Sequence, residues 1–123
     1  MGQVADGENE LKKVLGIQPQ NTQALRDLGA AYLSQSQPKQ AHAEFVTWLA
    51  QEPASQEAHV WLGMALAAEQ NPEAAIEEYK AALRQGPGNA DLHYNLGVAL
   101  RALGRDLEAR VQFEEARRLQ AGR

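Results

Sequence analysis

The chain has 123 residues, a formal net charge of −4 and no cysteine. Disulfides and thiol chemistry are therefore excluded, and the acidic balance argues against nucleic acid or an anionic membrane surface as a partner. No apolar run reaches the roughly 18 residues that a membrane-spanning helix needs. We expect a soluble protein without membrane insertion, in cytoplasm or periplasm, and the Gln- and Ala-rich composition favours a bacterial one.

The first expected helix covers residues 8–17 (ENELKKVLGI), and Leu11, Val14 and Leu15 give it an apolar face. Residues 1–7 are expected to form a flexible leader. Residues 8–21 look like the second half of a helical hairpin whose first helix is missing. The unpaired apolar face of residues 11–17 is a candidate surface for a homodimer.

From residue 22 the sequence repeats with a period of 34 residues, in units 22–55, 56–89 and 90–123. Such a period is typical of stacked helical repeats, which build a surface for holding another molecule. The residues that recur in phase are the prolines Pro19, Pro53 and Pro87, the pairs Leu28-Gly29, Leu62-Gly63 and Leu96-Gly97, the alanines Ala41, Ala75 and Ala109, and the aromatics Phe45, Tyr79 and Phe113.

Each unit divides into two helices, expected in the second unit over Gln56–Glu69 and Pro72–Gln85. Asn71 suits the N-cap of the second helix, and Gly104 suits a left-handed residue at the same break in the third unit. A glycine inside the first helix costs about 1 kcal/mol relative to alanine. In each of the three units we expect this cost to be offset by close packing of the second helix, which has a small alanine where the two helices cross.

The second unit, with His59, Leu62-Gly63, Leu66, Ala75, Tyr79, Ala82 and Pro87, resembles the tetratricopeptide repeat (TPR). The resemblance implies an all-α, right-handed solenoid of stacked hairpins, with three full repeats and an N-terminal half-repeat. Trp48 stands where the family has alanine, so the junction between the first two repeats should open or shift. Arg110 and Arg117 replace Ile76 and Leu83, which predicts a polar C-terminal helix.

Catalysis finds no support, because there is no phosphate-binding glycine loop and no His-Glu metal motif. His42, His59 and His93 are interpreted as packing or rim residues, since a metal site needs several convergent ligands. We therefore expect a non-enzyme without cofactor or metal. The late arginines alternate with carboxylates, so no basic stripe predicts a nucleic-acid partner.

The resemblance implies that the first helices line a concave groove that binds a protein or peptide. In the second unit this helix, Ala58–Ala68, is apolar nearly all round, which leaves apolar residues over for the groove. A central aromatic and methionine patch with a charged rim is typical of a peptide-binding hot spot. The predicted groove residues are Arg26, Leu33, Val60, Trp61, Met64, Tyr94, Asn95, Val98 and Arg101.

Chaperone-adaptor members of the family grip a C-terminal carboxylate at fixed groove positions, which correspond here to Arg26, Ala30, Trp61, Asp91 and Asn95. Only Arg26 and Asn95 fit, and Asp91 would repel the carboxylate, so this partner is not expected. Two alternatives to a peptide-binding scaffold stay open. One is self-assembly, and the other is an accessory domain of a larger enzyme or of an envelope or secretion assembly factor.

Overall fold

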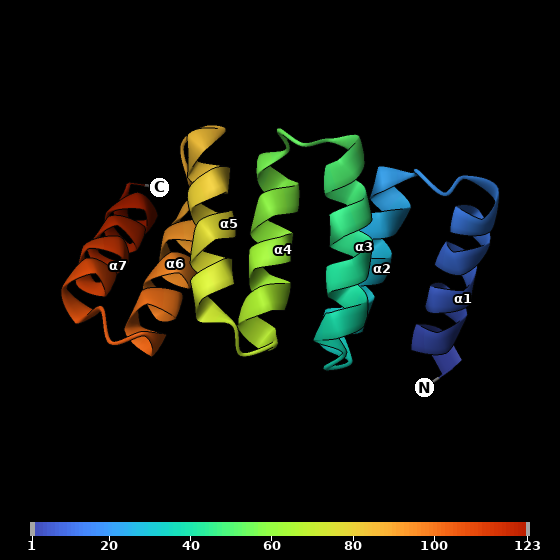
Figure 1. Ribbon diagram of the computed structural model, residues 1–123, viewed down its shortest axis with the longest axis horizontal. Helices are drawn as coiled ribbons and strands as arrows, with labels where there is room; N and C mark the ends of the chain where they lie inside the picture. Colours follow the sequence, from blue (N-terminus) through green and yellow to red (C-terminus); the bar gives the residue numbers. More distant parts are fainter. Residues whose placement is uncertain (1, 123) are drawn as a thin grey trace.

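The computed structural model describes residues 2–122, with side chains described from residue 7 onward. Within this range the chain forms helices and no strands, and the helices stand in one row with α1 and α7 at opposite ends (Figure 1). The helices are α1 (Gly2–Ile17), α2 (Thr22–Ser34), α3 (Pro38–Gln51), α4 (Gln56–Ala68), α5 (Pro72–Arg84), α6 (Ala90–Ala102) and α7 (Asp106–Ala121).

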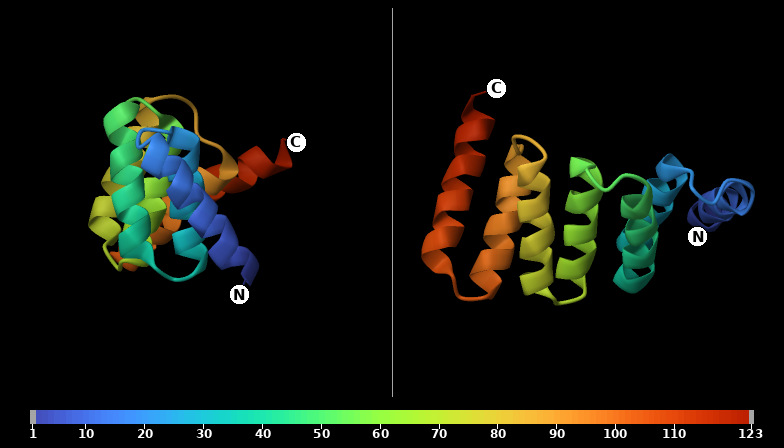
Figure 2. Two further views of the ribbon diagram at one scale, coloured as in Figure 1. Left: turned by 90° about the vertical axis from the view of Figure 1, so that its right-hand side faces the viewer. Right: turned by 45° about the horizontal axis from the view of Figure 1, so that its top comes forward.

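The helices pack as hairpins, α2 on α3, α4 on α5 and α6 on α7, and each hairpin stacks on the next through α3 on α4 and α5 on α6. The first helices also contact one another, α2 with α4 and α4 with α6, whereas α3 and α5 do not touch in the described residues. These contacts place α2, α4 and α6 on the inner side of the array, and Figure 2 shows the row of helices from two further directions. This is a helical-hairpin solenoid whose inner face is built by α2, α4 and α6.

Helix α1 begins at Gly2 and does not leave residues 2–7 as a separate leader. The helix expected over residues 8–17 therefore begins six residues earlier than predicted, and Met1 of the expected leader lies outside the described residues. The physical reason is that residues 3–12 contain one glycine, Gly7, and no proline, and a single glycine costs too little to end a helix. Among the described residues, the backbone of α1 lies against α2 and against no other helix.

The first helix of each hairpin is capped at the same repeat position. Asn21, Ser55 and Asn89 each accept a hydrogen bond from the backbone N–H three residues later, at 2.9, 3.1 and 2.8 Å. Asn71 caps α5 in the same way, as its sequence position predicted. A side-chain acceptor at the N-cap typically contributes about 1 kcal/mol, so these caps fix where each hairpin begins.

The turn inside each hairpin contains one left-handed residue, again at a fixed repeat position: Ser36 (φ 59°), Gln70 (φ 65°) and Gly104 (φ 77°). Gly104 was predicted to adopt this conformation, and it does. Ser36 and Gln70 adopt it without the conformational freedom of glycine, which costs about 1–2 kcal/mol. In each turn the next residue donates its backbone N–H to the carbonyl five residues earlier, that of Tyr32, Leu66 or Leu100, so the same hydrogen bond holds the turn with or without glycine.

The repeated glycine lies under the aromatic ring of the second helix. A Cβ built at Gly63 would lie 2.5 Å from Cε1 of Tyr79, and one at Gly97 would lie 2.6 Å from Cε1 of Phe113. The sequence predicted close approach at these glycines, but it assigned the contact to the buried alanines. The ring presses on the glycine, because a flat side chain reaches across the interhelical gap that alanine is too short to fill.

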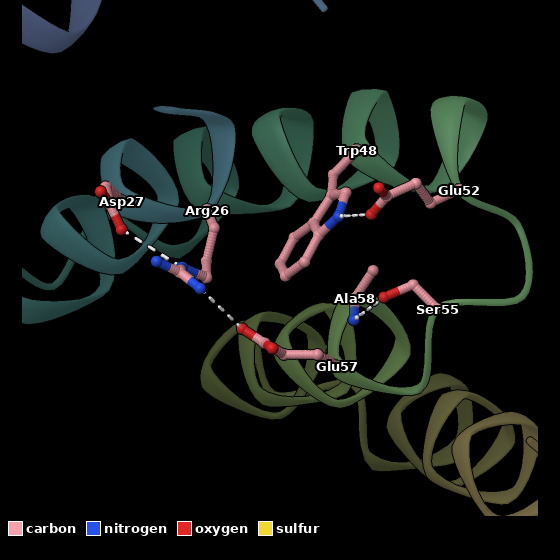
Figure 3. A network of polar contacts seen from close by, with 7 residues as sticks. All are labelled: Arg26, Asp27, Trp48, Glu52, Ser55, Glu57 and Ala58. Atoms are coloured by element: carbon pink, nitrogen blue, oxygen red, sulfur yellow. Dashed lines mark hydrogen bonds and ion pairs between the residues drawn. The ribbon is translucent and has the colours of Figure 1, made fainter. Parts of the chain in front are cut away.

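Trp48 is buried at the junction of α3 and α4. Its Nε1 donates a hydrogen bond to Oε1 of Glu52 at 2.7 Å, and Figure 3 shows this contact close to Ala58. At the next junction the same two repeat positions hold a small and a large residue in the opposite order, Ala82 and Leu92. Because the small Ala58 offsets the indole, α3 packs on α4 as extensively as α5 on α6, and the expected opening of the junction is not observed.

The connection between α5 and α6 contains Gly86, Pro87 and Gly88, yet it is fixed by a side chain. Nε2 of Gln56, in the first turn of α4, lies 3.1, 2.9 and 3.0 Å from the carbonyl oxygens of Ala82, Gly86 and Pro87. These carbonyls end α5 and begin the connection. One amide at the start of the second repeat therefore holds the connection that leads to the third, beside the groove that Gln56 and Pro87 line.

Candidate functional site: the concave groove

Two hollows lie side by side between α4 and α6, on the inner face. The first, of about 660 Å³, and the second, of about 580 Å³, share Met64 and Asn95 and so form one groove. The first hollow is lined by Gln56, Glu57, Val60, Trp61, Met64, Pro87, Asn89, Asp91, Leu92 and Asn95. The second is lined by Met64, Ala67, Gln70, Pro72, Tyr79, Asn95, Val98, Ala99 and Ala102.

Five of the nine residues predicted from the sequence line this groove: Val60, Trp61, Met64, Asn95 and Val98. They come from α4 and α6. Met64 follows Val60 and Trp61 by four and three residues, and Val98 follows Asn95 by three, and residues at these spacings share one face of a helix. Val98 is 37 % exposed, and the other four are partly buried. The groove therefore has an apolar floor with one amide in its middle.

Trp61 forms part of the groove wall and part of the core. Its ring packs against that of Phe45, with the centroids 5.7 Å apart and the planes tilted by 38°. In the next repeat, Asn95 occupies the Trp61 position and Tyr79 the Phe45 position. Trp61 therefore covers the aromatic residue of the preceding repeat, and only the remaining part of its indole faces the groove.

Arg26 and Leu33, both from α2, do not line either hollow. The guanidinium of Arg26 pairs with Asp27 and with Glu57, each at 3.2 Å, which joins α2 to α4 (Figure 3). These hydrogen-bonded carboxylates raise the pKa of Arg26 further above its ordinary value, so the group stays charged and engaged. Leu33 is partly buried against the core.

Tyr94 and Arg101 lie beyond the groove, at the end of the array formed by α6 and α7. The Arg101 guanidinium carbon stands 5.4 Å from the ring centroid of Phe113, and the Tyr94 ring lies 5.5 Å from the same ring. A cation over an aromatic face is attracted by the ring quadrupole. A third hollow of about 540 Å³ adjoins these side chains and shares only Asp91 with the groove.

The histidines are engaged within the array, as the sequence predicted. Nδ1 of His59 lies 2.8 Å from Glu78, and Nδ1 of His93 lies 2.7 Å from Gln112, so the same link between the two helices recurs 34 residues later. His42 lies 2.6 Å from Glu69. Among the residues that the structure describes, no group of three or more His, Cys, Asp or Glu could hold a metal ion.

Several groove residues were not predicted from the sequence. Gln70 lines the groove from the turn between α4 and α5, Pro72 from the first position of α5, and Pro87 and Asn89 from the connection before α6. Tyr79 lines it from α5, and burial raises the pKa of its phenol to about 12. The signal available for the loop residues was the repeat itself, since the breaks between helices recur at fixed positions.

The comparisons with known proteins agree with this architecture. A family model described as tetratricopeptide repeat matches residues 26–90 and 69–123, so the chain belongs to the TPR family. No curated protein matches it in sequence. The family and the solenoid fold make the chain a protein–protein interaction scaffold, and no helix over the described residues is long and apolar enough to cross a membrane.

Solved structures of MamA are similar over nearly the whole chain. One crystal structure of MamA has a TM-score of 0.90 and 26% identity, and the alignment covers 98% of this chain and 71% of that chain. A double mutant of MamA from RS-1 has a TM-score of 0.89 and 25% identity, with coverage of 98% and 68%. MamA from residue 41 to its end, from Desulfovibrio magneticus RS-1, has a TM-score of 0.90 and 24% identity, with coverage of 99% and 69%.

Proposed function

We propose that the scaffold binds a peptide segment of a partner protein in its concave groove, without catalysing a reaction. The observation that carries the proposal is the meeting of the two hollows at Met64 and Asn95, which makes a groove long enough for an extended or helical segment. Val60, Trp61, Met64 and Val98 provide the apolar contact. Methionine suits such a surface because its flexible thioether adapts to different side chains.

Asn95 supports a peptide partner more than a small apolar ligand. Its amide is partly buried where the two hollows meet, and no hydrogen bond of this side chain is found among the described residues. An amide offers two donors and an acceptor, which match the backbone N–H and C=O groups of a peptide. The apolar residues then give affinity, and Asn95 fixes the register of the bound chain.

A C-terminal carboxylate is not the group that this groove holds. The one basic residue at a matching position, Arg26, is paired with Asp27 and Glu57. Asp91 lies at the edge of the groove, where a second carboxylate would be repelled. Both features support an internal segment of the partner as the bound element.

A random twelve-residue peptide display library, selected against the purified chain, tests the proposal. Val98→Glu places a charge in the groove at a position that is already 37 % exposed, so the fold should tolerate it. The matched control is Val46→Glu on α3, where the side chain is 47 % exposed and lines neither hollow. We expect peptides that bind the wild type and Val46→Glu, and at least tenfold weaker binding to Val98→Glu.

Binding that Val98→Glu leaves unchanged would remove the groove as the site. Trp61→Ala is a weaker test, because Trp61 also packs on Phe45 and its loss would change stability as well as binding. Circular dichroism of each variant should show the same helix content. A thermal melt then separates weaker binding from partial unfolding.

A second candidate function is self-association through α1. Val14 and Ile17 on this helix are 37 % and 83 % exposed, and α1 contacts α2 alone among the described helices. Burial of apolar side chains drives most protein association. Sedimentation velocity at increasing concentration tests it: a dimer that Val14→Glu/Ile17→Glu abolishes supports α1 as the contact, and a monomer at every concentration rejects it.

A further inference from the structure

The charged side chains that line the groove are all acidic. Of the residues around its two hollows, only Glu57 and Asp91 carry a charge, and none is a lysine, arginine or histidine. The hollow around Val98, Ala67 and Ala102 has no charged lining residue at all. The groove is therefore acidic at one end and uncharged at the other.

The repeat explains why the carboxylates gather at one end. Glu57 and Asp91 are 34 residues apart, each in the first turn of its helix, α4 and α6. Since α4 and α6 run in the same direction on the inner face, both carboxylates lie at the end of the groove where these helices begin. Asp27 on α2 adds a third carboxylate on the side toward the N-terminus.

The cation on the α2 side of this end, Arg26, is already paired, and those on the α7 side, Arg101 and Arg117, line the third hollow, which shares Asp91 with the groove. Arg26 is held between Asp27 and Glu57 at 3.2 Å from each, while Asp91 is exposed and forms no ion pair within the described residues. The lining of the groove itself therefore carries two carboxylates and no cation. Charges at the mouth of an apolar groove steer complementary partners and penalise partners of like charge.

We infer that the partner segment is basic and apolar, with apolar side chains on the Met64–Val98 part of the groove and lysine or arginine side chains directed to Asp91 and Glu57. This inference rests on the proposed function. The basic side chains of the bound peptide then lie at the end of the groove where α4 and α6 begin. The long aliphatic stem of a lysine or arginine can lie on Val60 and Leu92 while its charge reaches the carboxylates.

The two carboxylates also stabilise the N-termini of their own helices through the helix dipole. A control for that effect exists in the chain. Glu73 is in the first turn of α5, is exposed, and lines neither hollow. Glu73→Gln therefore removes a carboxylate from a helix N-terminus without changing the groove.

The test is the same random display library, selected in parallel against the wild type, Glu57→Gln/Asp91→Asn and Glu73→Gln. We expect lysine and arginine to be enriched at least threefold on one side of the apolar positions with the wild type and with Glu73→Gln. We expect no enrichment with the double variant. A synthetic peptide of the most frequent sequence should bind the wild type about tenfold less tightly in 500 mM than in 50 mM NaCl.

The outcomes separate this inference from the proposed function. Peptides whose binding depends on Val98 but that show no enrichment in lysine and arginine would overturn the inference about charge. The same enrichment with the double variant would also overturn it. In both cases the groove would remain the binding site. Peptides that bind independently of Val98, or no peptides at all, would overturn the groove and the inference together. Basic enrichment that requires both Val98 and the carboxylates supports both.

Discussion

The ring of Tyr79 occupies the space where a side chain at Gly63 would begin, since a Cβ there would lie 2.5 Å from Cε1 of the ring. Gly63→Ala should therefore destabilise the chain by about 1–2 kcal/mol, because the overpacking cost of about 1–3 kcal/mol exceeds the gain in helix propensity. Chemical denaturation measures it. Gly7→Ala in α1 is the control, since no atom lies within 4 Å of its Cβ; it should be neutral or slightly stabilising.

Gln70, the left-handed residue in the turn between α4 and α5, is a position where a substitution should stabilise the fold. Gln70→Gly should raise the free energy of unfolding by about 0.5–1 kcal/mol, because relief of the left-handed strain exceeds the extra entropy that glycine loses on folding. Gly104→Ala should do the opposite, and its Cβ would meet no atom within 4 Å, so the backbone angle alone would act. Equal melting temperatures for all three proteins would contradict the strain argument.

Trp48 is expected to contribute to stability in two separable ways. Trp48→Ala should cost about 3–5 kcal/mol, because it leaves a cavity between α3 and α4. Trp48→Phe keeps most of the buried ring but loses the hydrogen bond to Glu52, and it should cost less. Urea titration of both variants distinguishes packing from hydrogen bonding, and an alanine variant as stable as the wild type would show that the indole is not part of the core.

Glu44 is expected to make stability depend on pH. Partial burial raises the pKa of its carboxyl above the ordinary value, with the charge of Lys12 acting in the opposite direction. In the two other repeats Glu78 and Gln112 at this position bind a histidine, but the first repeat has Leu25 there. The charged form of Glu44 therefore lacks that partner.

Because the folded-state pKa is raised, the contribution of Glu44 to stability is fully present below its unfolded pKa and is lost as the pH rises through its folded pKa. Glu44→Gln should therefore be more stable than the wild type at pH 7 and equally stable near pH 3.5. Thermal melts across this range measure it. A difference between Glu44→Gln and the wild type that stays constant across this range would point to packing instead of the charge.

Much of the fold followed from the 34-residue spacing. The repeat predicted the hairpins, the breaks at Asn71 and Gly104 and the close approach at the glycines, because each depends on residues near in sequence or on one repeated contact. It did not predict that the glycine meets the aromatic ring, that Ala58 accommodates Trp48, or that α1 reaches Gly2. The first two depend on how side-chain volumes match across an interface, which a pattern of residue types does not specify.

The groove was predicted in outline and not in detail. The apolar character of Ala58–Ala68 indicated that residues were left over for a surface, and Val60, Met64 and Val98 lie there. Arg26 was expected on the groove rim, but its ion pairs turn it into a link between α2 and α4. The sequence could not reveal this, because two of the three charges are adjacent in the chain and the third is 31 residues away.

The amide of Gln56 has a consequence for the elasticity of the array. The Gly-Pro-Gly connection before α6 would by composition be the most flexible point of the solenoid. The Gln56 side chain nevertheless contacts two of its carbonyl groups, those of Gly86 and Pro87, and that of Ala82 at the end of α5. The connection at residues 18–21 has only local hydrogen bonds, and the farthest reach four residues along the chain, to Val14 and Leu25. Under a bending force the array should therefore deform first between α1 and α2, while the groove between α4 and α6 keeps its shape.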